Sequence, residues 1–381
     1  MTAALPLSLF ASERVYAKIY PQAVANNLAI LKRALAREDG GDAPRVWATV
    51  KADAYGHGVA HIMAGLRAAD GLAVMHLTDA HICRDAGWSG PILVMAGLAH
   101  ASEIALLDMP DLHLLLSREP QLQWLAAAPA LRATPTVWLR FRGDIGMVGF
   151  DAASYRSAYA QCQSLAGTGR IGGQIGHLNH FGSAERADGI DEACDRFQAV
   201  THDLPGPRST SNSAAIMRHR GHAAMNDWVR PGLTLYGASP LADRSAADLG
   251  LLPAMSLHAR VLDIRTLAAG DRIGYGGNFQ APSPLTVGLV NCGYADGYPR
   301  HAPAGTPVMV AGQLTRTLGT VTMDLMTVDL TGLNADVGAP VVLWGDPKLP
   351  VERVAASMGT IAAELLTGLT RRVPLLTAPI S

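Results

Sequence analysis

The chain has 381 residues, of which 49% are hydrophobic and 17% charged, so it can bury a large core and more than one domain is expected. Its 31 Lys+Arg and 32 Asp+Glu leave a formal net charge of -1 without a basic run or an acidic tail, which argues against nucleic acid and membrane surfaces as partners. The start of the sequence lacks a secretory pattern, and no stretch of about 20 apolar residues follows, so we expect a cytoplasmic protein without a membrane span.

The first part of the chain, from 45 to 237, alternates between two kinds of segment. Strand-like apolar runs cover 46–51, 72–76, 91–96, 112–117, 134–141, 173–179, 209–212 and 232–236. Stretches with helical spacing cover 59–69, 78–86, 101–107, 151–165 and 189–202. This alternation is typical of parallel βαβ units, and eight strands predict a closed (β/α)8 barrel of the TIM type.

The pattern changes after residue 238. Short strand-like runs separated by Gly and Pro cover 253–264, 271–276, 285–292, 307–310, 313–319, 326–330 and 339–344, and one helix is expected from 351 to 367. We therefore predict an α/β fold with the barrel over 1–244 and a mostly β domain over 245–381.

Few residues offer nucleophilic or metal-binding chemistry. The four cysteines, at 83, 162, 194 and 292, have no metal-binding spacing, so we expect free thiols in a reducing compartment and no metal site. The chain has only four lysines, Lys18, Lys32, Lys51 and Lys348.

Lys51 ends the first predicted barrel strand, where barrel enzymes place their reactive groups. A lysine at a strand end can extend into solvent, or it can work at the rim, where partial desolvation lowers its pKa and allows a Schiff base. Ser213 and the backbone around Gly232 and Leu233 follow the last strands, where barrels commonly bind phosphate, although a glycine there can also serve packing alone. A reactive lysine and a phosphate site on one rim suggest pyridoxal phosphate.

Eight segments of the sequence resemble those of the alanine racemase family of pyridoxal-phosphate enzymes. They are VKADAYGHG at 50–58, NHFGSA at 179–184, SNSAA at 211–215, VRPGLTLYG at 229–237, IGYGG at 273–277, GYADGYPR at 293–300, TMDLMTVDL at 322–330 and GTIAAELLTGLTRRVP at 359–374. The resemblance implies a racemase that interconverts L-alanine and D-alanine and supplies D-alanine for peptidoglycan. It also implies that a strand at about 14–19 joins the second domain.

The resemblance further implies roles for single residues. Lys51 would hold the cofactor and exchange a proton on one face of the substrate Cα, and Tyr275 would act on the other face. Tyr275 would come from the second subunit of a homodimer with shared active sites. Arg230 would face the pyridine nitrogen and His180 would lie beside the ring. The phosphate contacts would come from Tyr55, Ser213, Gly232 and Leu233, the substrate carboxylate contact from Met323, and the entrance from Tyr294 and Asp324.

Three positions depart from the family pattern. The segment 139–150 carries Arg140 where the family usually has a lysine, and Met147 where it has an arginine that supports the cofactor and the substrate carboxylate. We hypothesise that Arg140 or Arg142 supplies a substitute cation. Ala363 stands where the family usually has a tyrosine that narrows the pocket, which predicts weaker cofactor binding or a wider substrate range.

Other functions remain open at this level. A racemase of serine, lysine or other amino acids, a decarboxylase of the same architecture, and a non-catalytic pyridoxal-phosphate carrier would each use the same barrel. The decarboxylase lacks support from a triple-glycine phosphate loop, and the carrier would not need Tyr275.

Overall fold

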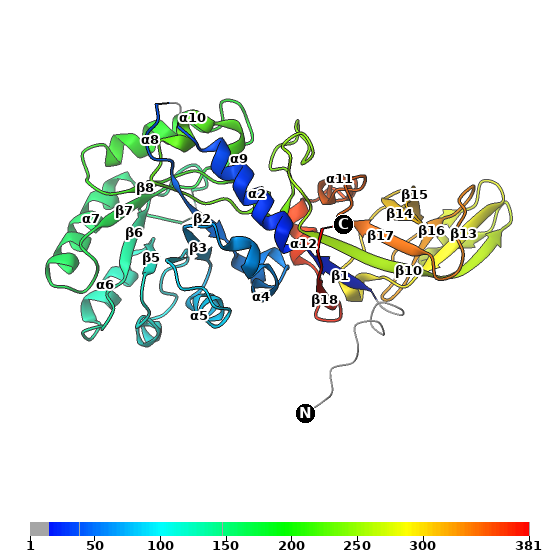
Figure 1. Cartoon of the computed structure of the whole chain (residues 1–381), viewed down its shortest axis with the longest axis horizontal. Helices are drawn as coiled ribbons and strands as arrows, with labels where there is room; N and C mark the ends of the chain where they lie inside the picture. The colour runs from blue at the N-terminus through cyan, green and yellow to red at the C-terminus, as the bar shows by residue number, and fades with distance from the viewer. Residues whose placement is uncertain (1–14, 38, 147, 381) are drawn as a thin grey trace.

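The computed structural model describes residues 15–37, 39–146 and 148–380. It consists of a barrel and a second, mostly β body, which lie at opposite ends of the molecule (Figure 1). The predicted fold class is confirmed. Met147 lies outside the described residues, as does Arg14.

The barrel contains eight parallel strands that neighbour one another in the order β8-β7-β6-β5-β4-β3-β2-β9. Their bounds are β2 (Arg45–Thr49), β3 (Gly71–Val74), β4 (Ile92–Val94), β5 (Leu112–Leu116), β6 (Thr136–Arg140), β7 (Ile175–Leu178), β8 (Arg208–Ser209) and β9 (Trp228–Val229). The ring closes between β8 and β9 through a parallel bridge from Asn212 to Arg230 and a 2.9 Å hydrogen bond from the Arg230 amide to the Ser211 carbonyl.

The predicted eighth strand, at 232–236, is wrong. These residues form the 3-10 helix η3 (Leu233–Tyr236), and the strand lies earlier, at β9. Pro231 has no N–H group for a strand ladder, and Gly237 ends the helix with φ of 81°, so the apolar run is wound rather than extended. Arg230 therefore lies at the carboxyl end of the last strand, not before its start.

Helices surround the barrel on its outside (Figure 1). They are α2 (Pro21–Ala34), α4 (Val59–Ile62), α5 (Leu77–Asp85), α6 (Glu119–Ala127), α7 (Ala152–Gly167), α8 (Asp191–Thr201), α9 (Ser213–Arg218) and α10 (Arg220–Ala224). The helices predicted at 59–69 and 101–107 are partly wrong, because 3-10 turns replace them in η1 (Met63–Leu66) and η2 (Ala101–Leu106).

Bulky aromatic side chains fill the barrel interior. Trp47 and Trp228 stack with ring centroids 3.8 Å apart, and both pack with Trp138 in one buried cluster. Gly71 and Gly176 make room for them, since a Cβ at either position would lie 2.3 Å from the ring of Trp47 or Trp138 respectively. This packed layer closes the inside of the barrel, so the rim at the strand ends is the place for chemistry.

The second sheet has the strand order β13-β16-β15-β14-β17-β10-β1-β18, and β13 also pairs with β10. Its bounds are β1 (Tyr16–Ile19), β10 (Met255–Leu267), β13 (Leu285–Val290), β14 (Pro307–Val310), β15 (Gln313–Leu318), β16 (Met326–Asp329), β17 (Pro340–Trp344) and β18 (Leu375–Thr377). The long strand β10 changes register between Val261 and Asp263, so its first part pairs with β1 and β17 and its second part with β13. The chain thus contributes β1 to this sheet before it builds the barrel.

The remaining elements are short. The hairpin β11 (Arg272–Ile273) and β12 (Phe279–Gln280) encloses the 3-10 turn η4 (Tyr275–Gly277), so the strand predicted over 271–276 is shorter than expected. The helix predicted over 351–367 is interrupted and forms α11 (Val351–Ser357) and α12 (Ala362–Thr367), because Gly359 takes a left-handed φ of 71°.

Candidate active site

Lys51 lies just beyond the carboxyl end of β2 and opens the short turn α3 (Lys51–Tyr55). The next four residues, 52–55, have positive φ angles between 50° and 57°, so the turn is left-handed although none of them is glycine. This conformation costs roughly 1–2 kcal/mol per residue, and such strain clusters at functional sites. The turn therefore fixes the direction of the backbone immediately after Lys51.

The left-handed turn is held from both sides. His57 is fully buried, and its Nδ1 lies 3.0 Å from the carbonyl oxygens of both Ala54 and Tyr55. Burial lowers the pKa of His57 to about 4, so the ring is neutral at pH 7 and donates through Nδ1–H. On the other side, a Cβ at Gly56 would lie 2.2 Å from the Leu366 carbonyl oxygen, so the turn contacts α12 directly.

A small polar group forms where α3, α9 and η3 meet. The Gly232 amide donates to Ser213 Oγ at 2.9 Å, and the Thr234 hydroxyl donates to the same oxygen at 3.0 Å. Tyr55 closes the group, since a Cβ at Gly232 would lie only 2.5 Å from the Tyr55 Oη. Burial raises the pKa of Tyr55, which is therefore a neutral hydrogen-bond donor. Leu233 follows Gly232 as the first residue of η3.

Arg230 is buried, and its described hydrogen bonds go to uncharged groups. Its Nη1 donates to the Ser209 carbonyl at 2.7 Å and to the Ser209 hydroxyl, and its Nη2 donates to the Asn179 carbonyl at 2.6 Å and to the Thr210 carbonyl at 3.5 Å. Burial, with a contribution from Arg140, lowers the pKa of Arg230 to about 9. The guanidinium still carries its charge at neutral pH, so it offers donors and no acceptor.

The same rim gathers further positive charge. Burial lowers the pKa of His180 to about 3, and the positive charges of Arg230, Arg140 and Lys51 act in the same direction. In the described part of the chain, no ion pair joins these three cations to a carboxylate. A rim with several cations and a neutral histidine is suited to an anionic ligand.

Arg140 and Arg142 lie in different surroundings. Arg140 ends β6, and its Nε is buried without a hydrogen-bond partner among the residues that the structure describes. Arg142 is exposed and forms an ion pair with Asp151, with 3.0 Å between Nη2 and Oδ2. Of the two substitutes that the sequence leaves open, the geometry therefore favours Arg140.

The predicted residues of the second body are exposed. Tyr275 is 71% exposed in η4, and Met323 is 52% exposed before β16. Tyr294 begins the turn η5 (Tyr294–Asp296), which bonds to the Met323 carbonyl through the Ala295 amide at 2.9 Å. Asp324 pairs with Arg372 at 2.8 Å. Among the residues that the structure describes, no hydrogen bond or ion pair joins Tyr275, Met323, Tyr294 or Asp324 to Lys51.

Ala363 is half-buried in α12, the helix that contacts the turn after Lys51. Its side chain is a single methyl group, which is much smaller than the tyrosine that the family usually has at this position.

Sequence reasoning missed two groups at this rim. Ser209 and the Asn179 carbonyl hold Arg230, and both amide atoms of the Asn179 side chain are buried without partners in the described part of the chain. Ser209 ends β8 and Asn179 directly follows β7, so their positions at strand ends are readable from the sequence, whereas their bonds to Arg230 depend on how the strands pack.

The fold and site define a two-domain barrel protein with a lysine and an anion-binding rim at the strand ends. The family model described as "Alanine racemase, N-terminal domain" matches residues 19–240, and "Alanine racemase, C-terminal domain" matches residues 254–377. The chain therefore belongs to the alanine racemase family.

Individual relatives agree with this assignment. The chain is 43% identical to an alanine racemase of Bordetella petrii over 369 residues, which cover 94% of this chain and 98% of the relative. It is similar to the crystal structure of a biosynthetic alanine racemase from Pseudomonas aeruginosa, with a TM-score of 0.88 and 39% identity over 96% of this chain and 99% of that one. The alanine racemase structure from Acinetobacter baumannii gives a TM-score of 0.85 at 29% identity, over 96% of this chain and 100% of that one.

Proposed function

We propose that this protein is a pyridoxal-phosphate-dependent racemase that interconverts L-alanine and D-alanine. The observation that carries the proposal is one barrel rim with Lys51, Arg230 and the Ser213–Gly232 group, where no carboxylate of the described residues pairs with either cation. The names of the relatives support alanine as the substrate.

The residues present fit pyridoxal phosphate. Gly232 leaves a space that a Cβ would fill, beside the Ser213 hydroxyl and the neutral Tyr55 phenol. These groups, with the backbone at Leu233, would hold the phosphate. Lys51 would hold the cofactor covalently, with His180 beside the ring and Arg230 at the pyridine nitrogen. The bound cofactor supplies a conjugated ring that withdraws electrons from the substrate Cα.

The chain itself supplies the proton transfers. Racemisation needs an acid/base group on each face of Cα, because a single base returns the proton to the side from which it came. Lys51 moves the proton on one face and Tyr275 on the other. Arg230 would donate to the pyridine nitrogen and would leave it unprotonated, since a guanidinium has donors and no acceptor. Met323 binds the substrate carboxylate through its backbone N–H.

In this proposal, Tyr275 of one subunit transfers the proton in the active site of the partner subunit of a homodimer. Its 71% exposure supports this, because a catalytic tyrosine that is open in one chain can be covered by a second copy. The proposal thus includes shared active sites.

The racemase proposal is tested by chiral analysis of purified protein incubated with pyridoxal phosphate and L-alanine. We expect D-alanine to form, with no turnover in Lys51→Ala. Turnover that survives in Lys51→Ala would refute the role assigned to Lys51. The absence of turnover in the wild type would refute the proposed activity.

The shared site is tested by mixing two inactive variants, Lys51→Ala and Tyr275→Phe. Random reassociation makes half of the dimers hybrid, and each hybrid contains one intact site, so activity returns to about a quarter of wild type. If Tyr275 serves its own barrel, no intact site forms and the mixture stays inactive.

A second candidate is a racemase with a wider substrate range, which Ala363 favours because its side chain is smaller than the tyrosine that the family usually has there. Parallel assays with L-serine and L-lysine distinguish the two.

Within the described ranges no helix is long and apolar enough to cross a bilayer. We further propose a cytoplasmic location, a supply of D-alanine to peptidoglycan, and a division between the domains near residue 244.

A further inference from the structure

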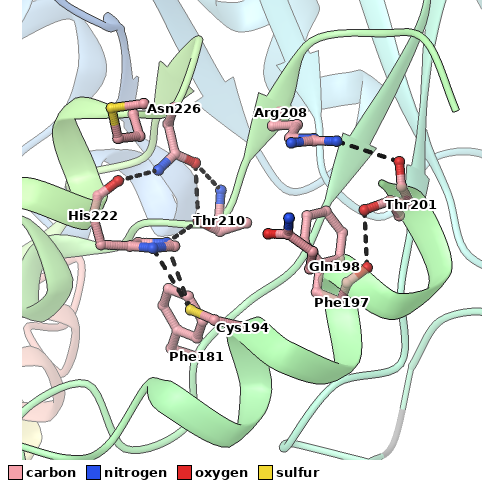
Figure 2. A pocket seen from close by; sticks show the side chains of 10 residues that line it. Phe181, Cys194, Phe197, Gln198, Thr201, Arg208, Thr210, His222 and Asn226 are labelled. Atoms are coloured by element: carbon pink, nitrogen blue, oxygen red, sulfur yellow. Dashed lines mark hydrogen bonds between the residues drawn. The ribbon is translucent and has the colours of Figure 1, made fainter. Parts of the chain in front are cut away.

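A cavity of about 400 Å³ lies between the end of β8 and the outer helices α8 and α10 (Figure 2). Phe181 and residues of α8, β8 and α10 line it, together with Thr210, Met225 and Asn226. Its inner wall is Thr210, which directly follows Ser209, the residue that holds Arg230.

The segment 209–211 is bound from the inside by Arg230. The two terminal nitrogens of Arg230 bond to the Ser209 and Thr210 carbonyls, and its amide bonds to the Ser211 carbonyl at 2.9 Å. The position of these carbonyls therefore sets the position of the guanidinium.

The same segment is bound from the outside by Asn226. Its Oδ1 accepts from the Thr210 amide at 2.6 Å and from the Thr210 hydroxyl at 2.9 Å, and its Nδ2 donates to Ser211 Oγ at 3.3 Å (Figure 2 shows the contacts to Thr210). Strand β8 ends at Ser209, and the amide of the next residue, Thr210, donates to this side chain rather than to a neighbouring strand.

His222 completes the outer support. The single hydroxyl proton of Thr210 goes to Asn226, so the 2.9 Å contact between Thr210 Oγ1 and His222 Nε2 must be a donation from the histidine. His222 Nδ1 is then an acceptor, and it lies 3.6 Å from the Cys194 Sγ. Burial lowers the pKa of His222 and raises that of Cys194 to about 11, so both groups are neutral. Each member of the chain then donates to the next, from Cys194 to His222, Thr210 and Asn226.

We propose that Thr210 is a positioning residue: Asn226 and His222 hold it from the outer cavity so that its backbone fixes Arg230 on the inner rim. Its link to catalysis rests on the proposed function, in which Arg230 faces the cofactor ring. The nearby Phe181 strengthens the connection, because its ring packs on His222 at 5.4 Å and its chain neighbour is His180.

The test compares Thr210→Val, which keeps the shape and removes the hydroxyl, with Thr210→Ser, which restores it. Thr201→Val is the matched control. Thr201 is also buried and lines the same cavity, but its hydroxyl donates to the Phe197 carbonyl of its own helix at 2.8 Å. If Thr210→Val does not fold, His222→Phe removes the donor to Thr210 and keeps a ring against Phe181.

The first readout uses the cofactor-free protein. Exchange of the Arg230 guanidinium protons with water is followed by NMR on arginine-labelled protein, with the signal assigned by its loss in Arg230→Lys. The loss of one or two hydrogen bonds behind Arg230 should raise the exchange rate about tenfold in Thr210→Val, and not in Thr210→Ser or Thr201→Val.

The second readout is the absorption spectrum of bound pyridoxal phosphate. We expect a shifted maximum in Thr210→Val, restored in Thr210→Ser and absent in the control. Wild-type exchange and spectrum in folded Thr210→Val would overturn the proposal. A wild-type protein that binds no pyridoxal phosphate would refute the proposed function instead, and the exchange rates would still decide the role of Thr210.

Discussion

Arg140 gives the most direct test of how this site binds its substrate. Its Nε is buried without a described partner, and its charge acts on His180 and Arg230, with no carboxylate paired to it in the described residues. A charge-assisted hydrogen bond to a carboxylate or phenolate contributes about 1.5–3 kcal/mol. Arg140→Met should therefore lower kcat/KM for alanine roughly 10- to 150-fold.

The same change should have the opposite effect on the stability of the cofactor-free protein. A buried polar group without a partner costs about 1–3 kcal/mol, so its removal should raise the free energy of unfolding. Urea unfolding of the cofactor-free protein measures this, beside kinetics of the loaded enzyme. Activity and stability that fall together would point to a misfolded variant rather than to a lost anion contact.

Arg142→Met is the matched control for Arg140→Met. Its exposed ion pair with Asp151 contributes about 0–1 kcal/mol, so kinetics should stay near wild type. The reasoning is refuted if Arg142→Met loses activity while Arg140→Met keeps it, or if neither variant differs from wild type.

Three further predictions concern the cofactor, acid stability and substrate range. Gly232→Ala places a Cβ 2.5 Å from the Tyr55 Oη. Overpacking of about 1–3 kcal/mol should weaken pyridoxal-phosphate affinity roughly 5- to 150-fold in a titration, with partial recovery on adding Tyr55→Phe. Unchanged affinity would exclude the group of Tyr55, Ser213 and Gly232 as the phosphate site. His57 has a pKa of about 4 in the folded state and about 6.5 in the unfolded state, so between these pH values the unfolded state binds one more proton and stability falls as pH drops from 6.5 to 4. The His57→Gln variant should take up about one proton fewer than wild type on unfolding at pH 5. Equal proton uptake by the two proteins would contradict this prediction. Ala363→Tyr should reduce kcat/KM for serine relative to alanine by about tenfold, and a constant ratio would show that this position does not limit the pocket.

The alternation of strands and helices was enough to predict the barrel and to place Lys51 beyond the end of its first strand, because a period of two or 3.6 residues is a local signal. Ser213 was expected at a strand end, but β8 ends at Ser209 and Ser213 begins helix α9. The prediction of the eighth strand was wrong because the strand has only two residues, Trp228 and Val229, which is too few to show a period. The longer apolar run after Pro231 resembled a strand and was assigned as one.

Other features of the site depend on contacts that the sequence does not display. The left-handed turn at 52–55 contains residues that ordinarily avoid positive φ, and it is held by His57 and by α12, which lies some 300 positions later. Strand alternation puts Arg140 on the same side as the interior Trp138, but only the partner Asp151 explains why Arg142 turns away.

The place of β1 in the second sheet has a consequence for synthesis on the ribosome. Tyr16–Ile19 is made before the barrel, yet it pairs with Met255–His258 of β10 and with Leu375–Thr377 of β18, which are both made after the barrel. At about 5–20 residues per second, β1 waits roughly 20–70 s for β18. The barrel strands, whose partners follow one another along the chain, can associate during this time. A chaperone that binds nascent chains would therefore find β1 as an unpaired apolar strand, and a stalled chain released before β18 would expose that edge to other chains.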